Sequence, residues 1–471
     1  MSDDKICWMS ALQLAEAYSN RELSPVDVLD AILERLKRYN PELNSIVTLN
    51  SASAKTAAKK AERDIKTGKA CSLSGIPITI KDLVWTKGIR TTFGSKLYEN
   101  FVPDEDAVLV ERLKNAGAVI IGKTNVPEFG LIAYTDNLIF GATHNPWDKT
   151  KTSGGSSGGA AAAVAAGIGP IAHGNDGGGS IRIPASFCGV YGFKPSFGRV
   201  PDYPGLPMWE TLNADGPITR TVSDAALVLD VIIGPDERDR CSLPKTGERF
   251  LANVDDGVAG SKIAYTPNLG YAAVDVDVEN ITRKAAFQFE MLQCEVTEIK
   301  PDLINMESDF INFIIARSVA ANAKRLEEWK KVVYPYYSSF LELEPSLKSR
   351  DIVQIEYKRE ELWRKMCRIF DRYDFLLTPV TAVAAYDIGT GGPVFPSKIA
   401  GKGVGPIGWM PFTYPFNLTG QPAASIPSGF TARGLPIGLQ IVGRRYDDLG
   451  VLKASRAYEK RFPWQVKRPP L

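Results

Sequence analysis

The segment GNDGGGSIRIPASFCGVYGFKPSFGRV, residues 174–200, is the stretch that decides how the chain is interpreted. Four of its first six residues are glycine, and Ser180 follows them directly. Glycine loses more backbone freedom on folding than any other residue, so a run this dense indicates that bare backbone is required. The run could be a flexible linker, a cradle for a phosphate, or a loop that presents Ser180 to a reacting carbonyl group.

The residues after Ser180 argue against a nucleotide-binding loop. A dinucleotide-binding GxGxxG loop follows a strand, opens a helix and has an acidic residue about twenty positions later. Here IRIPASF follows, and we expect Pro184 to interrupt any helix. Adjacent bare amides suit an oxyanion hole instead, in which N–H groups stabilise a developing charge while Ser180 Oγ attacks the carbon. The candidate donors are the amides of Gly177, Gly178, Gly179 and Ser180.

Two further segments contain residues that such chemistry needs. SGGSSGGAAAAVAAG, residues 153–167, leads into an alanine-rich helix pattern and lacks the Gly-Lys-Ser/Thr ending of a phosphate loop. We therefore expect a turn that presents Ser156 and Ser157 at a helix N-terminus. In PITIKDLV, residues 77–84, Lys81 follows an apolar strand. Most lysines at strand ends are solvated, but a lysine held in the interior has a lowered pKa and can act as a base.

The composition of the chain excludes several classes of function. Its 471 residues carry 56 basic and 54 acidic side chains, which gives no electrostatic reason to expect binding of nucleic acid or of a membrane. No apolar run is long enough to span a membrane, and MSDDKICWMS is unlike a secretory signal. The six cysteines occur singly without CxxC spacing, which indicates reduced thiols in a cytoplasmic protein and neither disulfides nor a zinc site.

Histidine is scarce, because the chain contains only His144 and His173. A Ser-His-Asp triad, a histidine-rich metal site or a histidine base would each have to use one of these two residues. Lysine and carboxylates therefore stay open as candidate bases.

Short apolar segments alternate with helix patterns, which predicts one α/β body over residues 1–471 around a mostly parallel sheet. Helix patterns fill about residues 8–68, where Ser24 and Pro25 are a typical N-cap and first helical residue. Residues 300–372 have helix patterns without strands, and we expect them to cover one edge of the sheet near the substrate entrance. Strands are expected in GIPITIKD, AVIIGKT, IGPIAHG, KIAYT, DFLLTP, AASIP and IGLQIVG.

Taken together, these segments resemble the amidase signature family of serine hydrolases. The resemblance runs through GGSSGG (154–159), residues 174–200 and ADGPITRTVSDAA (214–226), and continues to FNLTGQPAASIP (416–427) and GLPIGLQIVG (434–443). It covers nearly the whole chain apart from the helical region near 300–350, and a motif of this length is highly specific. The resemblance implies an α/β fold with a mixed, mostly parallel central sheet flanked by helices on both faces.

The resemblance also implies a Ser–cis-Ser–Lys triad that hydrolyses an amide through an acyl-serine intermediate. By position, Ser180 corresponds to the nucleophile, Ser156 to the bridging serine that follows a cis peptide bond, and Lys81 to the base. Lys123 in IGKTNVPEFG is the competing lysine, but the family pattern gives it a structural place. Such a triad uses no metal or cofactor, and it explains the scarcity of histidine because no imidazole is needed.

The positions around the nucleophile follow the family with two departures. Ser157, Asp176 and Arg182 correspond to residues that support the loop by hydrogen bonding and charge, and loop scaffolding alone is an equally good interpretation of each. Many relatives have serine or threonine on either side of the aspartate that Asp176 matches. This chain has Asn175 and Gly177 there, which leave the triad in place and could alter the floor of the pocket.

The sequence favours an apolar or aryl amide as the small-molecule substrate, with esters and carbamates as further candidates. The main alternative is the A subunit of a glutamyl-tRNA(Gln) amidotransferase, which uses glutamine and has an anchoring aspartate near the position of Met410. Methionine cannot replace an ion-pair anchor. The apolar candidates for the pocket, each of which could equally be core packing, are Tyr134, Met208, Trp209, Trp409, Met410 and Phe412.

An alternative of another class is a catalytically inert scaffold with the same fold. The presence of all three triad residues argues against it. We expect no membrane association, and the family resemblance is compatible with a homodimer.

Overall fold

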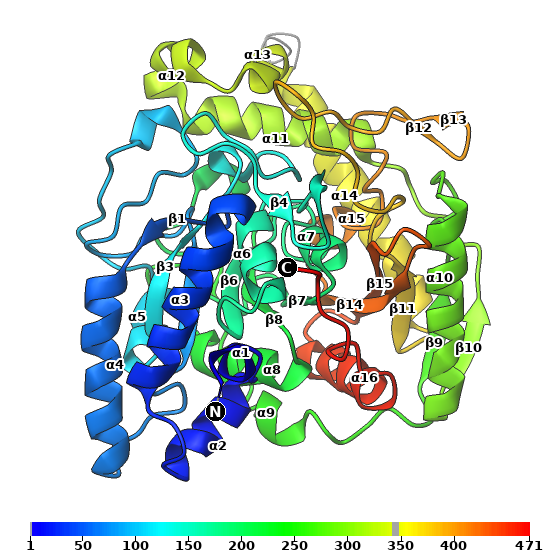
Figure 1. The fold of residues 1–471 in the computed structure, drawn as a ribbon. Coiled ribbons are helices and arrows are strands. Elements are labelled where there is room, and N and C mark those ends of the chain that lie inside the picture. Colours follow the sequence, from blue (N-terminus) through cyan, green and yellow to red (C-terminus); the bar gives the residue numbers. More distant parts are fainter. Residues whose placement is uncertain (1, 342–347) are drawn as a thin grey trace.

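The computed structural model, which describes residues 2–341 and 348–471, is built around a large central β-sheet (Figure 1). Eleven strands of the described residues form this sheet in the order β1-β3-β2-β6-β8-β7-β14-β15-β11-β9-β10. Neighbours in the sheet are often far apart in sequence, so the sheet joins the N-terminal, middle and C-terminal parts of the chain. The strands are β1 (Ile46–Leu49), β2 (Pro77–Lys81), β3 (Val119–Thr124), β6 (Ile171–Asn175), β7 (Tyr191–Lys194), β8 (Asp215–Thr219), β9 (Lys262–Tyr265), β10 (Glu295–Glu298), β11 (Phe375–Pro379), β14 (Ala423–Phe430) and β15 (Pro436–Gly443), and two small hairpins contain β4 (His144–Asn145) with β5 (Asp148–Thr152) and β12 (Lys398–Ile399) with β13 (Lys402–Gly403).

Parallel and antiparallel pairing are separated within the sheet. β2 pairs in parallel with β3 and β6, and β9 pairs in parallel with β10 and β11. Between the described strands the other six neighbouring pairs are antiparallel. The predicted α/β class with a mixed sheet between helices is confirmed, while the parallel share, four of ten pairs, is smaller than expected. Short connections such as the one between β14 and β15 explain this, because a hairpin joins only antiparallel strands.

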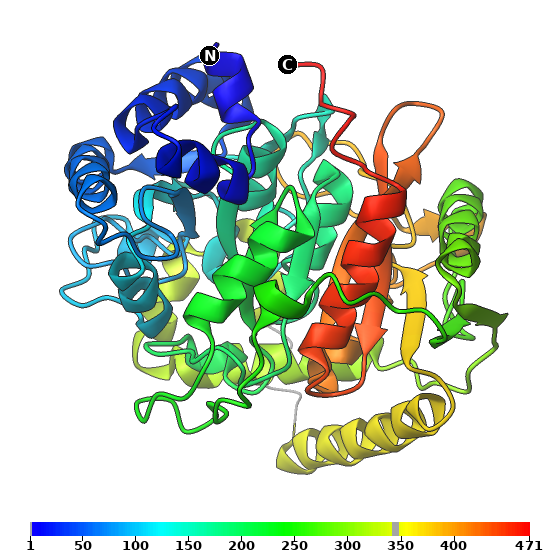
Figure 2. The same cartoon turned by 90° about the horizontal axis from the view of Figure 1, so that it is seen from below.

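Helices cover both faces of the sheet (Figure 1 and Figure 2). α6 (Gly158–Ala165) and α7 (Arg182–Cys188) pack against β6 and β7, while α8 (Val222–Ile232) and α16 (Asp448–Arg461) pack against β8 and β15 from the other side. Successive residues of β6 point to the two faces, because Ile171 belongs to the core beside α8 and Ala172 to the core beside α6. The other helices of the described residues are α1 (Asp3–Cys7), α2 (Ala11–Ser19), α3 (Pro25–Leu43), α4 (Ser51–Lys66), α5 (Val108–Asn115), α9 (Phe250–Asn253), α10 (Val276–Phe287), α11 (Glu307–Ala321), α12 (Leu326–Val332), α13 (Pro335–Leu341), α14 (Ser349–Phe370) and α15 (Pro415–Leu418).

The N-terminal segment is largely helical, as predicted, and its caps follow from the sequence. Ser24 caps α3 by accepting a hydrogen bond from the Asp27 N–H, and Pro25 is the first helical residue. The segment over about 8–68 also contains β1, which pairs antiparallel with β3 at the edge of the sheet. The predicted helical segment is therefore interrupted by one strand.

The expectation that Pro184 prevents a helix after Ser180 is also wrong. α7 begins at Arg182, and Pro184 is its third residue. The first N–H groups of a helix have no partner within it, so a proline in the first turn removes no hydrogen bond. Ser180 consequently lies just before a short helix whose residues are all buried.

The predicted helical cover is present over the described residues of 300–372. α11, α12 and α13 lie along the top of Figure 1, and α11 contacts both α13 and α14. Residues of α11, α12 and α13 line the pocket that leads to Ser180, and the expected position near the substrate entrance stays a prediction. Residues 342–347 of this region lie outside the described residues.

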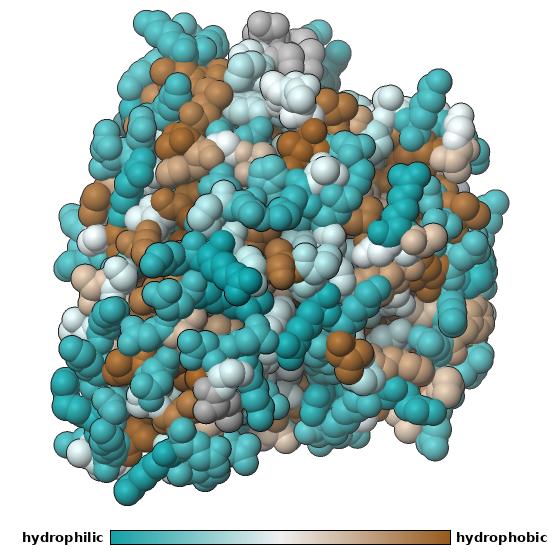
Figure 3. Space-filling model, in the orientation of Figure 1, coloured by the Kyte–Doolittle hydropathy of each residue, from teal (hydrophilic) through white to brown (hydrophobic). Residues whose placement is uncertain are grey.

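The surface carries many charged and polar groups. On the face drawn in Figure 3, hydrophobic residues form small groups among hydrophilic ones. Among the helices of residues 2–341 and 348–471, none has the length and apolar character needed to cross a membrane.

Candidate active site

Lys81 and Ser156 meet where β2 ends. Lys81 is the last residue of this strand, and Ser156 lies in the turn before α6, after a cis peptide bond with Gly155, as the family resemblance implies. Lys81 Nζ lies 2.7 Å from Ser156 Oγ, 2.5 Å from Asn175 Oδ1 and 3.2 Å from Asn175 O. Lys81 and Ser156 are both buried, so this contact is shielded from water. The fold thus brings together two residues that are 75 positions apart in the sequence.

Lys81 has the electrostatic environment of a base. Burial lowers the pKa of Lys81 to about 7, and the charges of Asp176 and Asp215 oppose this effect only partly. In the described part of the chain, no carboxylate forms a hydrogen bond with Lys81 Nζ. A large fraction of this lysine is therefore a neutral amine near pH 7, with a lone pair that can accept a proton.

Ser180 lies between β6 and α7 and lines an open pocket. The Ser157 N–H donates to the Ser180 carbonyl at 3.1 Å, which ties the glycine-rich loop of residues 176–181 to the residue beside Ser156. Gly130 lines the same pocket, and a Cβ placed on it would lie 3.2 Å from Ser156 Oγ. Within the described residues, Ser180 Oγ forms no hydrogen bond, so this hydroxyl is available to a substrate.

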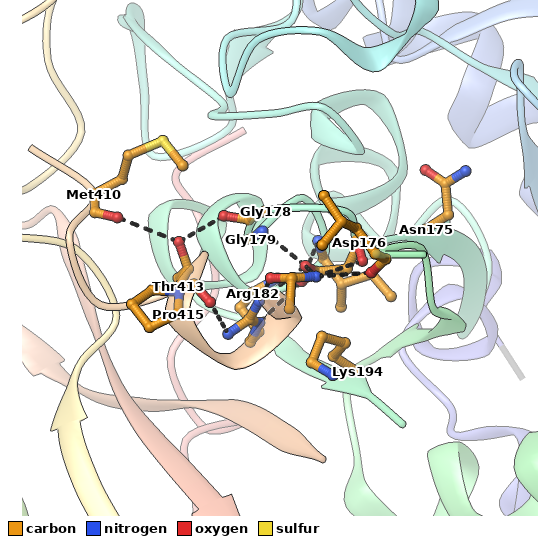
Figure 4. A network of polar contacts seen from close by, with 12 residues as sticks. Asn175, Asp176, Gly178, Gly179, Arg182, Lys194, Met410, Thr413 and Pro415 are labelled. Carbon is orange, nitrogen blue, oxygen red and sulfur yellow. Dashed lines mark hydrogen bonds and ion pairs between the residues drawn. The ribbon is translucent and has the colours of Figure 1, made fainter. Parts of the chain in front are cut away.

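A buried ion pair between Asp176 and Arg182 supports the glycine-rich loop that contains Ser180 (Figure 4). The Asp176 carboxylate accepts hydrogen bonds from the Gly179 and Ile181 N–H groups and pairs with the Arg182 guanidinium at 2.8 Å. Burial alone would raise the pKa of Asp176, but Arg182 holds it well below its usual range. The predicted supporting roles of Asp176 and Arg182 are therefore compatible with a rigid, charged scaffold under the loop.

Three residues of this scaffold, Thr413, Asn417 and Gln440, were not identified as site residues from the sequence. Arg182 donates to Gln440 Oε1, Asn417 Oδ1 and Thr413 O, and the Thr413 hydroxyl donates to the Gly178 carbonyl at 2.8 Å. Figure 4 shows how Thr413 lies between the loop and Arg182. Asn417 and Gln440 both lie inside segments that carry the family resemblance, which is the signal that could have identified them.

The oxyanion-hole prediction needs one correction, at Gly179. Its N–H donates to Asp176 Oδ1 at 2.7 Å, so it is not free to bind a substrate oxygen. The amides of Gly177, Gly178 and Ser180 form no hydrogen bonds within residues 2–341 and 348–471. These three amides are therefore the remaining candidate donors.

Lys123 is held by a different part of the chain. Its ammonium group donates to the Val84 carbonyl and to the hydroxyl groups of Thr86 and Thr91, at 3.1 and 2.8 Å for the two threonines. Lys123 is buried and lies 4.0 Å from Asp82, and in the described structure it forms no hydrogen bond with a serine. These contacts fit the structural place that the family resemblance gives to Lys123.

In the described structure, neither histidine forms a hydrogen bond with Ser156 or Ser180. His173 Nε2 lies 2.9 Å from Asp215 Oδ1, and burial followed by the charge of Lys81 lowers the pKa of His173 to about 3. His144 Nδ1 lies 2.7 Å from the Lys149 carbonyl in the small hairpin. His173 is therefore paired with Asp215 in the described structure, and this pair does not include Ser180.

The pocket that leads to Ser180 is apolar. It contains about 860 Å³ of empty space, part of it open to solvent, and no charged side chain of the described residues lines it. Of the six predicted pocket residues, Trp209, Trp409 and Met410 line this space. The other three do not line it and are buried in the surrounding core: Tyr134, Met208 and Phe412. Aromatic and aliphatic residues that the sequence analysis did not identify include Phe310, Ile314, Trp329 and Tyr337.

Gly177 is explained by the packing of Trp209. A Cβ on Gly177 would lie 2.4 Å from Trp209 Cε3, which is closer than any real contact. Trp209 cannot move away freely, because its indole N–H donates to the Phe129 carbonyl at 3.0 Å and its ring lies in the pocket wall. Glycine at position 177 therefore makes room for the indole beside Ser180.

We expect Gly177→Ser to raise KM for an aryl amide about tenfold, because the new side chain displaces the indole from the pocket wall. Steady-state kinetics with an acyl anilide measures this effect, and the double variant with Trp209→Ala should recover part of the loss. Gly403→Ser is the matched control, because a Cβ at Gly403 meets nothing within 4 Å. Equal KM values for the Gly177 variant and wild type would contradict the explanation.

The chain is similar to a known protein family and to characterised relatives over most of its length. A family model described as Amidase matches residues 27–452. An acylamidase from Rhodococcus erythropolis is 36% identical over 474 residues, covering 100% of this chain and 98% of its own. The A subunit of a glutamyl-tRNA(Gln) amidotransferase from Desulforapulum autotrophicum is 37% identical over 475 residues, covering 94% of this chain and 95% of its own.

Solved structures share the fold over almost the whole chain. A bacterial aryl acylamidase described as one of the amidase signature enzymes superimposes with a TM-score of 0.92 at 34% identity, covering 98% of this chain and 97% of its own. A 6-aminohexanoate cyclic dimer hydrolase, solved with its substrate, superimposes with a TM-score of 0.89 at 28% identity, covering 98% of this chain and 99% of its own.

Proposed function

The chain belongs to the amidase family and is an amide hydrolase, and we propose that it works through Ser180 as nucleophile, Ser156 as proton relay and Lys81 as base. The observation that carries this proposal is the contact of 2.7 Å between Lys81 Nζ and Ser156 Oγ, at a site where Ser180 faces an open pocket. A buried lysine with a pKa of about 7 can accept a proton near neutral pH, which a solvated lysine cannot.

In the proposed reaction, Ser180 Oγ attacks the amide carbonyl carbon. Its proton passes to Ser156 Oγ, and the proton of Ser156 passes to the neutral amine of Lys81. The relay then runs in reverse, so that the C–N bond breaks and the leaving amine takes up the proton. Water hydrolyses the acyl-serine ester by the same route, which regenerates the free Ser180 hydroxyl.

The charge that develops on the carbonyl oxygen needs donors close to Ser180. The amides of Gly177, Gly178 and Ser180 are the candidates, since they have no other partner in the described chain. One donor of this kind is worth about 3–4 kcal/mol of transition-state stabilisation in other hydrolases. The Asp176–Arg182 pair supports this arrangement, because it fixes the backbone on both sides of the loop.

The pocket supports an apolar or aryl acyl amide as the substrate. Trp209, Trp409 and Phe310 give it aromatic walls, and its described lining has no charged group. An apolar substrate would gain roughly 25 cal/mol for each Å² of surface that it buries there. The names of two similar proteins, an acylamidase and an aryl acylamidase, agree with this substrate class.

Glutamine is the second candidate substrate, because subunits of glutamyl-tRNA(Gln) amidotransferases are similar over most of the chain. A free glutamine carries an ammonium and a carboxylate group, and burying either without a partner costs several kcal/mol. The described lining offers Met410 and no acidic or basic side chain. The pocket therefore favours the apolar amide.

We expect kcat/KM for release of aniline from an apolar acyl anilide to exceed that for release of ammonia from glutamine at least a hundredfold. The reason is the missing ion-pair partner for glutamine in the pocket. Parallel assays with anilides, esters, carbamates and glutamine test this on the purified chain. A preference for glutamine, or activity that requires added partner subunits, would establish the amidotransferase function instead.

A further inference from the structure

Lys81 Nζ has an unusual set of partners. Its hydrogen bonds in the described structure go to Ser156 Oγ and to two oxygens of one residue, the side-chain and main-chain oxygens of Asn175. Asn175 is also one of the two positions at which the sequence analysis noted a difference from the serine or threonine of many relatives. The Asn175 side-chain oxygen makes the shortest of the three contacts, at 2.5 Å.

We propose that Asn175 is a positioning residue that directs the lone pair of neutral Lys81 toward Ser156. This inference rests on the proposed role of Lys81 as the base. A neutral amine has two N–H groups and one lone pair. Both oxygens of Asn175 accept hydrogen bonds, so they take up the two N–H groups, and the lone pair is left for the hydroxyl of Ser156.

The charged form of Lys81 would make a different contact with Ser156. A charged lysine has three N–H groups, and the third would donate to Ser156 Oγ. The Ser156 hydroxyl could then not transfer its proton to Lys81. Asn175 accepts two of the N–H groups of Lys81. When Lys81 loses one proton, its nitrogen therefore changes from a donor to an acceptor in the contact with Ser156.

The backbone of Asn175 is firmly placed. Asn175 is the last residue of β6, and it pairs with Asp215 of the antiparallel strand β8. Its carbonyl also accepts a hydrogen bond from Ser157 Oγ at 3.3 Å. A serine side chain at this position would end one bond short of the Asn175 oxygen, so it could not reach Lys81 Nζ at the same distance.

The charged groups around Lys81 are all engaged elsewhere. Asp176 is bound to Arg182, and Asp215 is bound to His173. Asp202 accepts a hydrogen bond from Asn213 Nδ2 at 2.9 Å, and burial followed by the charge of Asp215 raises the pKa of Asp202 to about 8. Asp82, the next residue in the chain, accepts hydrogen bonds from Thr92. Asn175 is thus the neutral acceptor that touches the amine while the carboxylates stay apart from it.

The test compares Asn175→Asp and Asn175→Ala with wild type in the pH dependence of kcat/KM for an acyl anilide. The carboxylate introduced by Asn175→Asp would stabilise the ammonium form of Lys81, so the midpoint of the rise in activity should move up by at least one pH unit. Activity at pH 7 should fall about tenfold and recover at high pH. The alanine variant should lose about 10- to 100-fold in kcat at every pH with KM unchanged, because the amine is free to turn.

Asn137→Ala is the matched control, since Asn137 is a buried asparagine whose side chain binds Asn125 and Val126 and not Lys81. It should keep the wild-type midpoint even if it lowers the melting temperature. A wild-type midpoint in the aspartate variant, or a kcat within twofold of wild type in the alanine variant, would overturn the inference, and either folded variant decides the question. If Lys81→Met keeps its activity, the proposed base itself is wrong, which is a distinct outcome.

Discussion

Replacement of Ser180 by alanine is expected to lower kcat for amide hydrolysis about 10⁶-fold while the protein stays folded. The loss is this large because the acyl intermediate cannot form without the hydroxyl, and residues that act as one catalytic unit fail together. The hydroxyl forms no hydrogen bond within the described structure, and only one oxygen atom is removed. Little stability should therefore be lost. Single-turnover kinetics and thermal unfolding measure the two quantities separately.

The control for this variant is covalent labelling. A fluorophosphonate should modify the wild-type protein once, at Ser180, and should not modify the alanine variant. Ser186 offers a matched comparison, because its buried hydroxyl accepts a hydrogen bond from the Gly438 N–H in the packing of α7 on β15. Ser186→Ala should still be labelled. Absence of labelling in folded wild-type protein would favour an inert scaffold, and hydrolysis by the alanine variant would remove Ser180 from the mechanism.

Local patterns in the sequence were sufficient for seven of the eleven described strands of the central sheet. Ser24 and Pro25 predicted the start of α3, and the apolar run before Lys81 predicted β2, because caps and short buried strands depend on neighbouring residues. The expectation that Pro184 would interrupt a helix is wrong, because it did not take into account where the helix begins. The effect of a proline depends on its position within a helix, and the start of α7 at Arg182 is not evident from the pattern.

The parts of the site that could not be predicted depend on contacts between distant segments. Gly179 looks like a free donor in the sequence, but Asp176 takes up its N–H because the loop folds back on itself. Trp209 reaches Gly177 across 32 positions, and no local pattern describes that contact. Asn175 is an unexplained departure until β2 and β6 come together beside Lys81. The family resemblance supplies the candidate triad, whereas the surroundings of each residue require the fold.

Replacement of Lys81 by methionine is expected to lower kcat/KM about 10³- to 10⁴-fold and to abolish its rise with pH. In the proposed mechanism the base is the neutral amine, so wild-type activity should rise with pH, with a midpoint near the Lys81 pKa of about 7, and level off above it. Methionine has no proton to exchange, so the residual activity of the variant should not rise with pH around 7. The variant should stay folded, because methionine has a similar shape, and its loss of stability comes from the oxygens of Ser156 and Asn175 that lose their donor.

Lys123→Met is the control that separates a catalytic lysine from a structural one. Lys123 is buried just as completely, but its three hydrogen bonds hold the loop after β2, and its removal leaves the buried Asp82 without its ion-pair partner. We expect it to cost about 3 kcal/mol or more of stability, while the folded fraction keeps the wild-type pH limb. The two variants thus have opposite signatures, one in activity and the other in stability. If Lys123→Met removed the pH limb and Lys81→Met kept it, the base would be Lys123.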